Sequence, residues 1–203
     1  MELKLLNSKF QTKILAQQKS NNLLSNKIIK TPILRGRKCK IVEFDKSFIT
    51  EEYVAWLNDL EVIKYSENRH RKITANDCFY YLQSMRNSGN YYWAIIVDNL
   101  DSRHVGNITV YVDRPNLVGD LAIVVGDKSI RGEGIGTEAA RLACDWLLKQ
   151  AGFRKVTAGT MAINKPMLKL MNAIGMKEEG LRKKQFMWNG REVDLVLSAK
   201  FQD

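Results

Sequence analysis

The spacing of apolar residues changes along the chain, and each change predicts a new element. Residues 39–44 alternate weakly between apolar and polar side chains and predict a first strand. Residues 47–56 predict a helix whose Phe48, Val54 and Trp56 are candidate core contacts. The folded part of the chain is therefore expected to begin with a strand followed by a helix.

A second helix and a hairpin are predicted next. Thr74 belongs to a polar stretch that can cap a helix, and this helix is expected to run through Met85. Two apolar, β-branched segments follow at 92–97 and 104–112, and the polar residues 98–102 join them. This arrangement predicts two antiparallel strands.

Strands and helices alternate in the C-terminal half. The predicted elements are a strand at 117–125, a helix at 137–150 that ends near Gly152, a strand at 153–160, a helix that Asn164, Lys165 and Pro166 open and Gly175 ends, and a hairpin in which residues 185–188 and 192–197 flank Asn189, Gly190 and Arg191. This mixture of elements indicates an α/β (α+β) fold.

The composition is that of a domain with its own hydrophobic core. The chain has 203 residues, 45% of them hydrophobic. No apolar run approaches the roughly 18 residues that a membrane span needs. The three cysteines, Cys39, Cys78 and Cys144, show no paired spacing, so we expect neither disulfides nor a metal site. With no secretory signal in the N-terminal residues, these features predict a cytoplasmic protein.

Positive charge is concentrated near the N-terminus. Residues 1–37 contain eight Lys or Arg residues and one Glu, whereas residues 38–203 contain 24 basic and 21 acidic residues. The net charge of +10 therefore does not predict a nucleic-acid partner. We divide the chain into a basic extension at 1–36 and a folded domain at 37–203. The extension is expected to be partly disordered, or to form an amphipathic helix around 10–15 that docks on a partner, on anionic lipid or on a second copy in a homodimer.

The most specific motif lies between a predicted strand and a helix. An apolar run at 121–125 precedes Arg131, and glycines at 132, 134 and 136 stand at the entrance of the helix. Backbone N–H groups exposed there bind anions, which predicts a site for a phosphate-bearing ligand; a turn that only needs positive φ is the alternative. The Rossmann pattern fails because Thr137 replaces its last glycine, and the P-loop pattern fails because no lysine follows Gly136.

The remaining pattern, Arg-x-x-Gly-x-Gly after a strand, resembles the acyl-CoA loop of the GCN5-related N-acetyltransferase (GNAT) superfamily. The resemblance implies a mixed, mostly antiparallel sheet flanked by helices, with the strand 120–125 splayed from its neighbour. It also implies acetyl-CoA (coenzyme A) as the cofactor, whose pyrophosphate the loop holds and whose pantetheine arm the strand binds. The corresponding residues are Ile123, Val124 and Val125 in the strand and Arg131, Gly132, Gly134, Ile135, Gly136 and Thr137 in the loop.

Further segments carry the same resemblance. Asn164, followed by Gly175 and Met176, is similar to a family segment whose Asn contacts the cofactor arm. Residues 53–62 resemble the opening of two branches: the acetyltransferases of ribosomal-protein N-termini, and those acting on amino sugars in surface-polysaccharide synthesis. Residues 104–108, His-Val-Gly-Asn-Ile, favour the sugar branch. The element order resembles the GNAT fold over about four-fifths of the chain.

Acetyl transfer to an amine needs a neutral nucleophile, stabilisation of an oxyanion and a proton for the departing thiolate. The resemblance implies that a backbone N–H at Val124 or Val125 stabilises the oxyanion. Asp120, at the start of the cofactor strand, is our candidate general base, and a solvated strand-end carboxylate is the alternative interpretation.

The general acid is left open by the sequence. The family's usual Tyr and Ser positions hold Met171 and Met167, and neither side chain donates a proton. Either Tyr65, Tyr111 or water takes this role, or the thiolate leaves without assistance.

The acceptor side is expected to involve four residues. Glu67 and His70 lie in the polar stretch between the first helices, although a surface role is the alternative for His70. Trp93, like Tyr65, either stacks on a sugar or packs in the core, with packing favoured for Trp93. Asn107 belongs to the segment that resembles the sugar branch.

These inferences predict an acetyl-CoA-dependent N-acetyltransferase acting on the primary amine of a small acceptor, an amino sugar or a nucleotide-linked amino sugar. The basic residues at 69–72 suit an acidic sugar nucleotide. The alternatives are an N-terminal acetyltransferase of a ribosomal or other protein, and a catalytically silent CoA-binding module.

Overall fold

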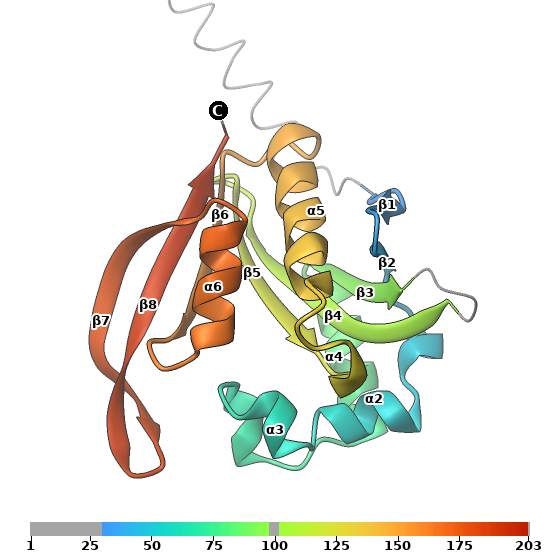
Figure 1. The fold of residues 1–203 in the computed structure, drawn as a ribbon. Helices are drawn as coiled ribbons and strands as arrows, with labels where there is room; N and C mark the ends of the chain where they lie inside the picture. The colour runs from blue at the N-terminus through green and yellow to red at the C-terminus, as the bar shows by residue number, and fades with distance from the viewer. Residues whose placement is uncertain (1–29, 98–101, 203) are drawn as a thin grey trace, which may run out of the picture.

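A computed structural model describes residues 30–97 and 102–202, which form an eight-stranded sheet with helices on both faces (Figure 1). The strands are ordered β1-β2-β3-β4-β5-β6-β8-β7 across the sheet. The predicted docking helix around 10–15 and most of the loop at 98–102 lie outside the described residues. Within the described part, no helix has the length and apolar character needed to cross a membrane.

The predicted elements occur in the predicted order, and β1, α3 and the 3-10 helices occur in addition. The strands are β1 (Leu34–Arg35), β2 (Cys39–Glu43), β3 (Tyr91–Val97), β4 (Arg103–Asp113), β5 (Val118–Val125), β6 (Lys155–Met161), β7 (Lys177–Trp188) and β8 (Arg191–Phe201). The helices are α2 (Glu51–Trp56), α3 (Leu60–Ile63), α4 (Ala75–Asn87), α5 (Ile135–Lys149) and α6 (Lys165–Ala173), with short 3-10 helices η1 (Lys46–Phe48), η2 (Glu67–His70) and η3 (Lys128–Ile130).

The sheet separates two hydrophobic cores. Because alternate residues of a strand point to opposite faces, Trp93 and Ile95 of β3 join the core under α5, whereas Tyr92 and Ile96 join the core under α2 and α4. Met171 of α6 belongs to the same core as α5. Helices α5 and α6 therefore cover one face of the sheet, and α2 and α4 cover the other (Figure 1).

The single helix predicted for residues 47–56 is wrong. The Thr50 hydroxyl accepts a hydrogen bond from the Tyr53 amide (3.1 Å) and caps a new helix that begins at Glu51. Since Thr50 itself has extended backbone angles, the chain turns there and separates η1 from α2. By contrast, the predicted cap at Thr74 is confirmed, and it forms a full capping box at the start of α4.

The ends of the sheet also differ from the expectation. The C-terminal hairpin is longer than residues 185–197, because β7 begins at Lys177. Most β7 residues are exposed on both faces, so they lack the apolar alternation that marks a strand. β1, which the apolar pattern did not predict, pairs Leu34 with Ile41 and lies inside the segment 1–36 assigned to the extension.

Only one pair of neighbouring strands in the described residues is parallel, and it separates early. β5 and β6 pair at three positions: Val118 with Lys155, Gly119 with Val156 and Asp120 with Thr157. β5 then continues to Val125 against β4, without β6 beside it. The predicted mixed, mostly antiparallel sheet with a splayed strand is therefore confirmed. We call the separated part the β5–β6 gap; it runs along residues 121–125 and 158–161.

The turn between β1 and β2 is fixed to the N-terminal end of α5. The Glu138 carboxylate accepts hydrogen bonds from the amides of Arg37 (3.0 Å), Lys38 (2.7 Å) and Cys39 (3.1 Å). A Cβ at Gly36 would lie 2.6 Å from Cδ of Glu138, so a larger residue there would displace the carboxylate from its present position. Partial burial raises the pKa of Glu138, but the hydrogen bonds lower it by more, and the net pKa lies below its ordinary value of 4.5.

Replacing Glu138 with Gln is expected to lower the free energy of unfolding by about 1–2 kcal/mol at neutral pH, because a neutral amide oxygen accepts weaker hydrogen bonds than a carboxylate. The lowered folded pKa means that the carboxylate stabilises the fold above its ordinary pKa of 4.5 and that this contribution is lost as the pH falls through the folded pKa. Urea denaturation at neutral pH and at about pH 3 measures both effects.

The difference in the free energy of unfolding between the unaltered protein and Glu138→Gln should therefore become smaller at acidic pH. The exposed Glu133, which precedes α5, provides the matched control as Glu133→Gln. A difference that is equal at both pH values would contradict a role for the ionised Glu138 carboxylate.

Candidate active site

The backbone of β5 is open toward the β5–β6 gap. The Gly126 amide donates to the Val105 carbonyl (2.9 Å), which fixes which residues bond to β4. In an antiparallel ladder every second residue bonds to the same neighbour, so Val124 faces β4 and the N–H groups of Ile123 and Val125 point into the gap. Two predicted strand residues thus offer free backbone donors on one edge.

The glycine loop places a second set of backbone donors beside the first. Gly132 and Gly134 have φ of 86° and 80°, a region that side chains with a Cβ disfavour. Gly134 is the N-cap of α5 and makes no side-chain cap, so the amides at the start of the helix, at Ile135, Gly136 and Thr137, are not satisfied by a capping side chain. They point outward at the positive end of the helix, where an anion binds most readily.

Close packing joins the loop to the strand. A Cβ at Gly136 would lie 3.1 Å from Cγ2 of Val125, so α5 enters directly against the end of β5. On the other side, a Cβ at Gly126 would overlap the Trp56 ring at 2.0 Å, which brings α2 against the same point. Arg131 is exposed, and its guanidinium donates to the Glu61 carbonyl of α3 (3.2 Å). These contacts hold the gap and the glycine loop in one fixed arrangement.

Asp120 lies in the last residue pair before β5 and β6 separate, a position that we call the fork. Its carboxylate accepts a hydrogen bond from the Thr157 hydroxyl (2.7 Å) on β6. The side chain keeps access to solvent, while the protein packed around it raises the pKa of Asp120 above its ordinary 3.8, an effect that the Thr157 hydrogen bond partly opposes. The residue that the sequence proposed as the base is therefore both reachable and more basic than a free carboxylate.

The face of the sheet that Asp120 shares with α2 and α4 carries other polar groups. Tyr111 is directly opposite Asp120 on β4, and its hydroxyl lies 2.7 Å from that of Tyr81. Asn107, opposite Val124, is 6% exposed, and its Oδ1 has no hydrogen-bond partner among the described residues. A buried amide oxygen without a donor is costly, so Asn107 is a candidate hydrogen-bond acceptor for a ligand.

His104 supports this region without taking part in acid–base chemistry. Its ring packs among Phe44, Phe48, Tyr53 and Trp56, and burial lowers the pKa of His104 to about 4. The neutral ring places Nε2 2.8 Å from the Gly106 carbonyl, where it acts as the donor. The histidine of the segment 104–108 is therefore part of the aromatic core.

The tip of the β7–β8 hairpin meets the segment that joins α3 to η2. Nε1 of Trp188 donates to the Lys64 carbonyl (3.2 Å), and the Trp188 ring stacks on Tyr65 with 6.1 Å between centroids. In the same region the Arg69 guanidinium donates to the Met187 carbonyl (3.2 Å). We call these three contacts the clasp. It ties the edge strand β7 to the segment in which the sequence placed the acceptor side.

Glu67 and His70 lie beside the clasp. Glu67 accepts a hydrogen bond from Arg69 (2.7 Å), and His70 lies 3.9 Å from the other Glu67 oxygen. Both side chains are largely exposed. Tyr65, Glu67 and His70 thus lie beside the hairpin tip, and their role on the acceptor side stays a prediction.

Other candidate residues have structural roles. Trp93 is 1% exposed in the core under α5, and its Nε1 donates to the Thr31 hydroxyl (3.0 Å). Asn164 accepts from the Met167 amide (3.3 Å) and caps α6, while its amide group donates to Thr160 (2.9 Å). Met171 is 2% exposed and packs in the core, so no proton donor takes the position where the family's tyrosine is expected.

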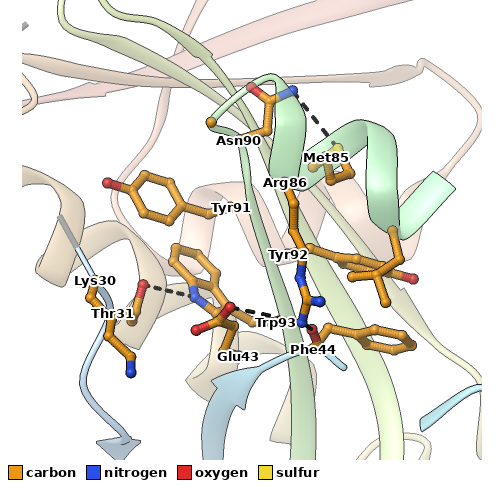
Figure 2. Close-up of a pocket in the computed structure, with 12 residues that line it drawn as sticks. Lys30, Thr31, Glu43, Phe44, Met85, Arg86, Asn90, Tyr91, Tyr92 and Trp93 are labelled. Carbon is orange, nitrogen blue, oxygen red and sulfur yellow. Dashed lines mark hydrogen bonds and ion pairs between the residues drawn. The ribbon is translucent and has the colours of Figure 1, made fainter. Parts of the chain in front are cut away.

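A cavity of about 350 Å³ lies elsewhere, between the start of β3, the end of α4 and residues 30–31 (Figure 2). Trp93 lines it together with Glu43, Phe44 and Arg86. Figure 2 shows the Trp93 indole directed toward Thr31. None of the residues predicted to bind the cofactor lines this cavity.

Several residues of the site did not emerge from the sequence. Thr157 and Trp188 sit on predicted strands, but their contacts with Asp120 and Lys64 cross 37 and 124 residues of chain. Glu138 was visible only as an acidic residue near the start of a helix, which favours the helix but does not reveal its partners in the β1–β2 turn.

A family model for the acetyltransferase (GNAT) domain matches residues 48–177. The chain belongs to the GNAT family of acetyltransferases. The family resemblance found in the sequence is thus confirmed, and the acetyltransferase enzyme class with it.

Two curated relatives are similar to this GNAT chain. A probable N-acetyltransferase of Bacillus subtilis strain 168 is 26% identical over 125 residues, which cover 61% of this chain and 66% of that protein. An N-acetyltransferase 9-like protein of Caenorhabditis briggsae is 21% identical over 175 residues, or 81% of this chain and 85% of that protein.

Solved GNAT structures share the fold. A ribosomal-protein alanine acetyltransferase from Vibrio fischeri superimposes with a TM-score of 0.69 at 19% identity, over 85% of this chain and 98% of that one. A spermidine N-acetyltransferase from Vibrio cholerae, in complex with CoA and spermine, superimposes with a TM-score of 0.72 at 13% identity, over 82% and 97%. At these identities the likeness establishes the fold.

Replacing Gly134 with Ala is expected to lower the free energy of unfolding by about 1 kcal/mol, because an L side chain is strained at positive φ. Gly180→Ala on β7 is the matched control, since that position has no positive φ and no atom within 4 Å of an added Cβ. Chemical denaturation of the three proteins measures the effect. Equal losses in both variants would show that the backbone at Gly134 is not constrained as described.

Proposed function

We propose that this protein is an acetyl-CoA-dependent N-acetyltransferase that acts on the primary amine of a small acceptor, an amino sugar or a nucleotide-linked amino sugar. The choice of acetyl-CoA as the acetyl donor rests on two neighbouring sets of open backbone amides. One set is at Ile123 and Val125 along the gap, and the other is at the start of α5. The free cysteines are buried, which suits a reducing, cytoplasmic setting.

The residues around the gap fit coenzyme A. The amides of Gly132, Gly134, Ile135, Gly136 and Thr137 would hold the pyrophosphate, with Arg131 as a nearby cation. The open edge at Ile123 and Val125 would bond the amides of the pantetheine arm, as an added strand does at a sheet edge. When bound, acetyl-CoA supplies the activated acetyl group. CoA complexes among solved GNAT structures support this assignment.

The side chains assign roles for the transfer. The Val125 amide is the candidate oxyanion donor, because it is already directed into the gap and needs no side chain. Asp120, with its raised pKa and solvent access, takes the proton from the acceptor amine through a chain of waters, because Val125 lies about 16 Å farther along the extended strand. With Met171 buried, Tyr111, which pairs with Asp120 across β4 and β5, is the candidate proton donor for the departing thiolate.

The clasp supports a small acceptor. Trp188, Arg69 and Tyr65 link the hairpin tip to the α3–η2 segment, which restricts the room for a long chain on that side. The exposed Arg71 and Lys72 beside it suit a phosphate-bearing sugar. The Asn107 oxygen offers an acceptor for a sugar hydroxyl or amine. A protein N-terminus is the second candidate, and a silent CoA-binding module is the third because Met171 and Met167 replace the usual donors.

Mixing the enzyme with acetyl-CoA and separate panels of amino sugars, nucleotide-linked amino sugars, peptides and polyamines is expected to release free thiol with the sugar panels. A thiol-reactive dye measures the rate. Preference for peptides would replace the sugar proposal with the N-terminal one, and CoA binding without turnover on any panel would support the silent module.

Replacing Asp120 with Asn is expected to reduce turnover by roughly 10²–10⁴-fold and to remove the acidic limb of the pH–rate profile. Thr157→Val removes the hydrogen bond that lowers the Asp120 pKa, so the acidic limb should move to higher pH with the enzyme still active. Asp113→Asn, at the end of β4, is the control for loss of a strand-end carboxylate. An unchanged limb and rate in the Asp120 variant would mean that this residue is not the base.

A further inference from the structure

The β1–β2 turn lies beside the glycine loop, at the N-terminal end of α5. The three amides at Arg37, Lys38 and Cys39 that bond Glu138 bring this turn to the first turn of α5. These residues precede the segment 48–177 that matches the family model. These bonds use backbone amides, and the Lys38 side chain is exposed, whereas the Cys39 side chain is buried against Glu138.

Lys38 extends from this turn across the loop. Its Nζ donates to the Glu133 carbonyl, the residue just before the N-cap of α5. The same Nζ lies 3.6 Å from the position that a Cβ on Gly134 would occupy. Lys38 is exposed, and within residues 30–97 and 102–202 no carboxylate forms an ion pair with its ammonium group.

This placement of charge is unfavourable without a ligand. The start of α5 carries the positive end of the helix dipole and amides that no side chain caps. A cation normally stabilises the opposite end of a helix, so an ammonium group at this position gains nothing from the helix itself. A phosphate lying on the amides would attract both the helix end and the ammonium group.

We propose that Lys38, which the β1–β2 turn supplies, is a phosphate ligand of coenzyme A, in addition to the backbone amides of β5 and of the glycine loop. The inference rests on the proposed binding of CoA at the glycine loop. Lys38 acts as a point charge on a flexible stem, so it can leave the Glu133 carbonyl and turn to either the pyrophosphate or the 3′-phosphate. Glu138 is then a positioning residue, because it fixes the turn from which Lys38 reaches the loop.

Calorimetric titration of the full chain with CoA and with 3′-dephospho-CoA tests the proposal without requiring turnover. Lys38→Gln should weaken CoA binding roughly tenfold, the value of one charge-assisted contact. Lys38→Arg should retain most of the affinity. Lys149→Gln is the matched control: it removes the same charge at the far end of the same helix, about 20 Å away at 1.5 Å per residue, and should leave binding unchanged.

Comparing CoA with 3′-dephospho-CoA shows which phosphate Lys38 contacts. A loss confined to CoA supports contact with the 3′-phosphate, and an equal loss for both ligands supports contact with the pyrophosphate. Unchanged binding of both ligands by Lys38→Gln overturns the proposal while the proposed function stands. If the unaltered protein binds neither ligand, the cofactor assignment fails and the role of Lys38 fails with it. Equal urea midpoints of the ligand-free proteins show that the variants are folded.

Discussion

The separation of β5 from β6 is the constraint on which the rest of the site depends. A strand in the middle of a sheet normally bonds on both sides, and unpaired backbone groups there carry a cost unless water or a ligand satisfies them. β5 loses its second neighbour after Asp120, so Ile123 and Val125 present N–H groups where the sheet should continue. The fold stabilises this gap through its surroundings, with α5 against Val125 and Trp56 against Gly126.

Two features at opposite ends of the gap follow from the same separation. At the fork, the last pair brings Asp120 to Thr157, so a carboxylate with a raised pKa sits where the strands begin to part. At the open end, the chain leaves β5 at Val125, passes through η3 and enters α5 at Ile135, with left-handed backbone at Gly132 and Gly134. The proposed base and the proposed anion site are thus placed by one irregularity in the sheet.

Signals that act over a few residues were readable from the sequence. The cap at Thr74 and the glycine turn before α5 rest on local backbone chemistry and marked where two helices begin, whereas the splayed strand was implied by the resemblance to the GNAT superfamily. Contacts between distant segments were not readable. Glu138 meets Lys38 across 100 residues, and nothing in a glutamate at the start of a helix names its partner. The break of the predicted helix 47–56 was missed because capping at Thr50 outweighed the apolar pattern.

The clasp has a consequence for which residues can diverge among related chains. Its two hydrogen bonds end on the main-chain carbonyls of Lys64 and Met187, not on their side chains. Every residue has such a carbonyl, so exchanges at these positions keep both bonds. The Trp188 and Arg69 side chains make these contacts, so these two residues must be kept, whereas the side chains of Lys64 and Met187 can vary. Related chains can therefore exchange side chains beside the clasp without first breaking the contacts that hold the hairpin tip.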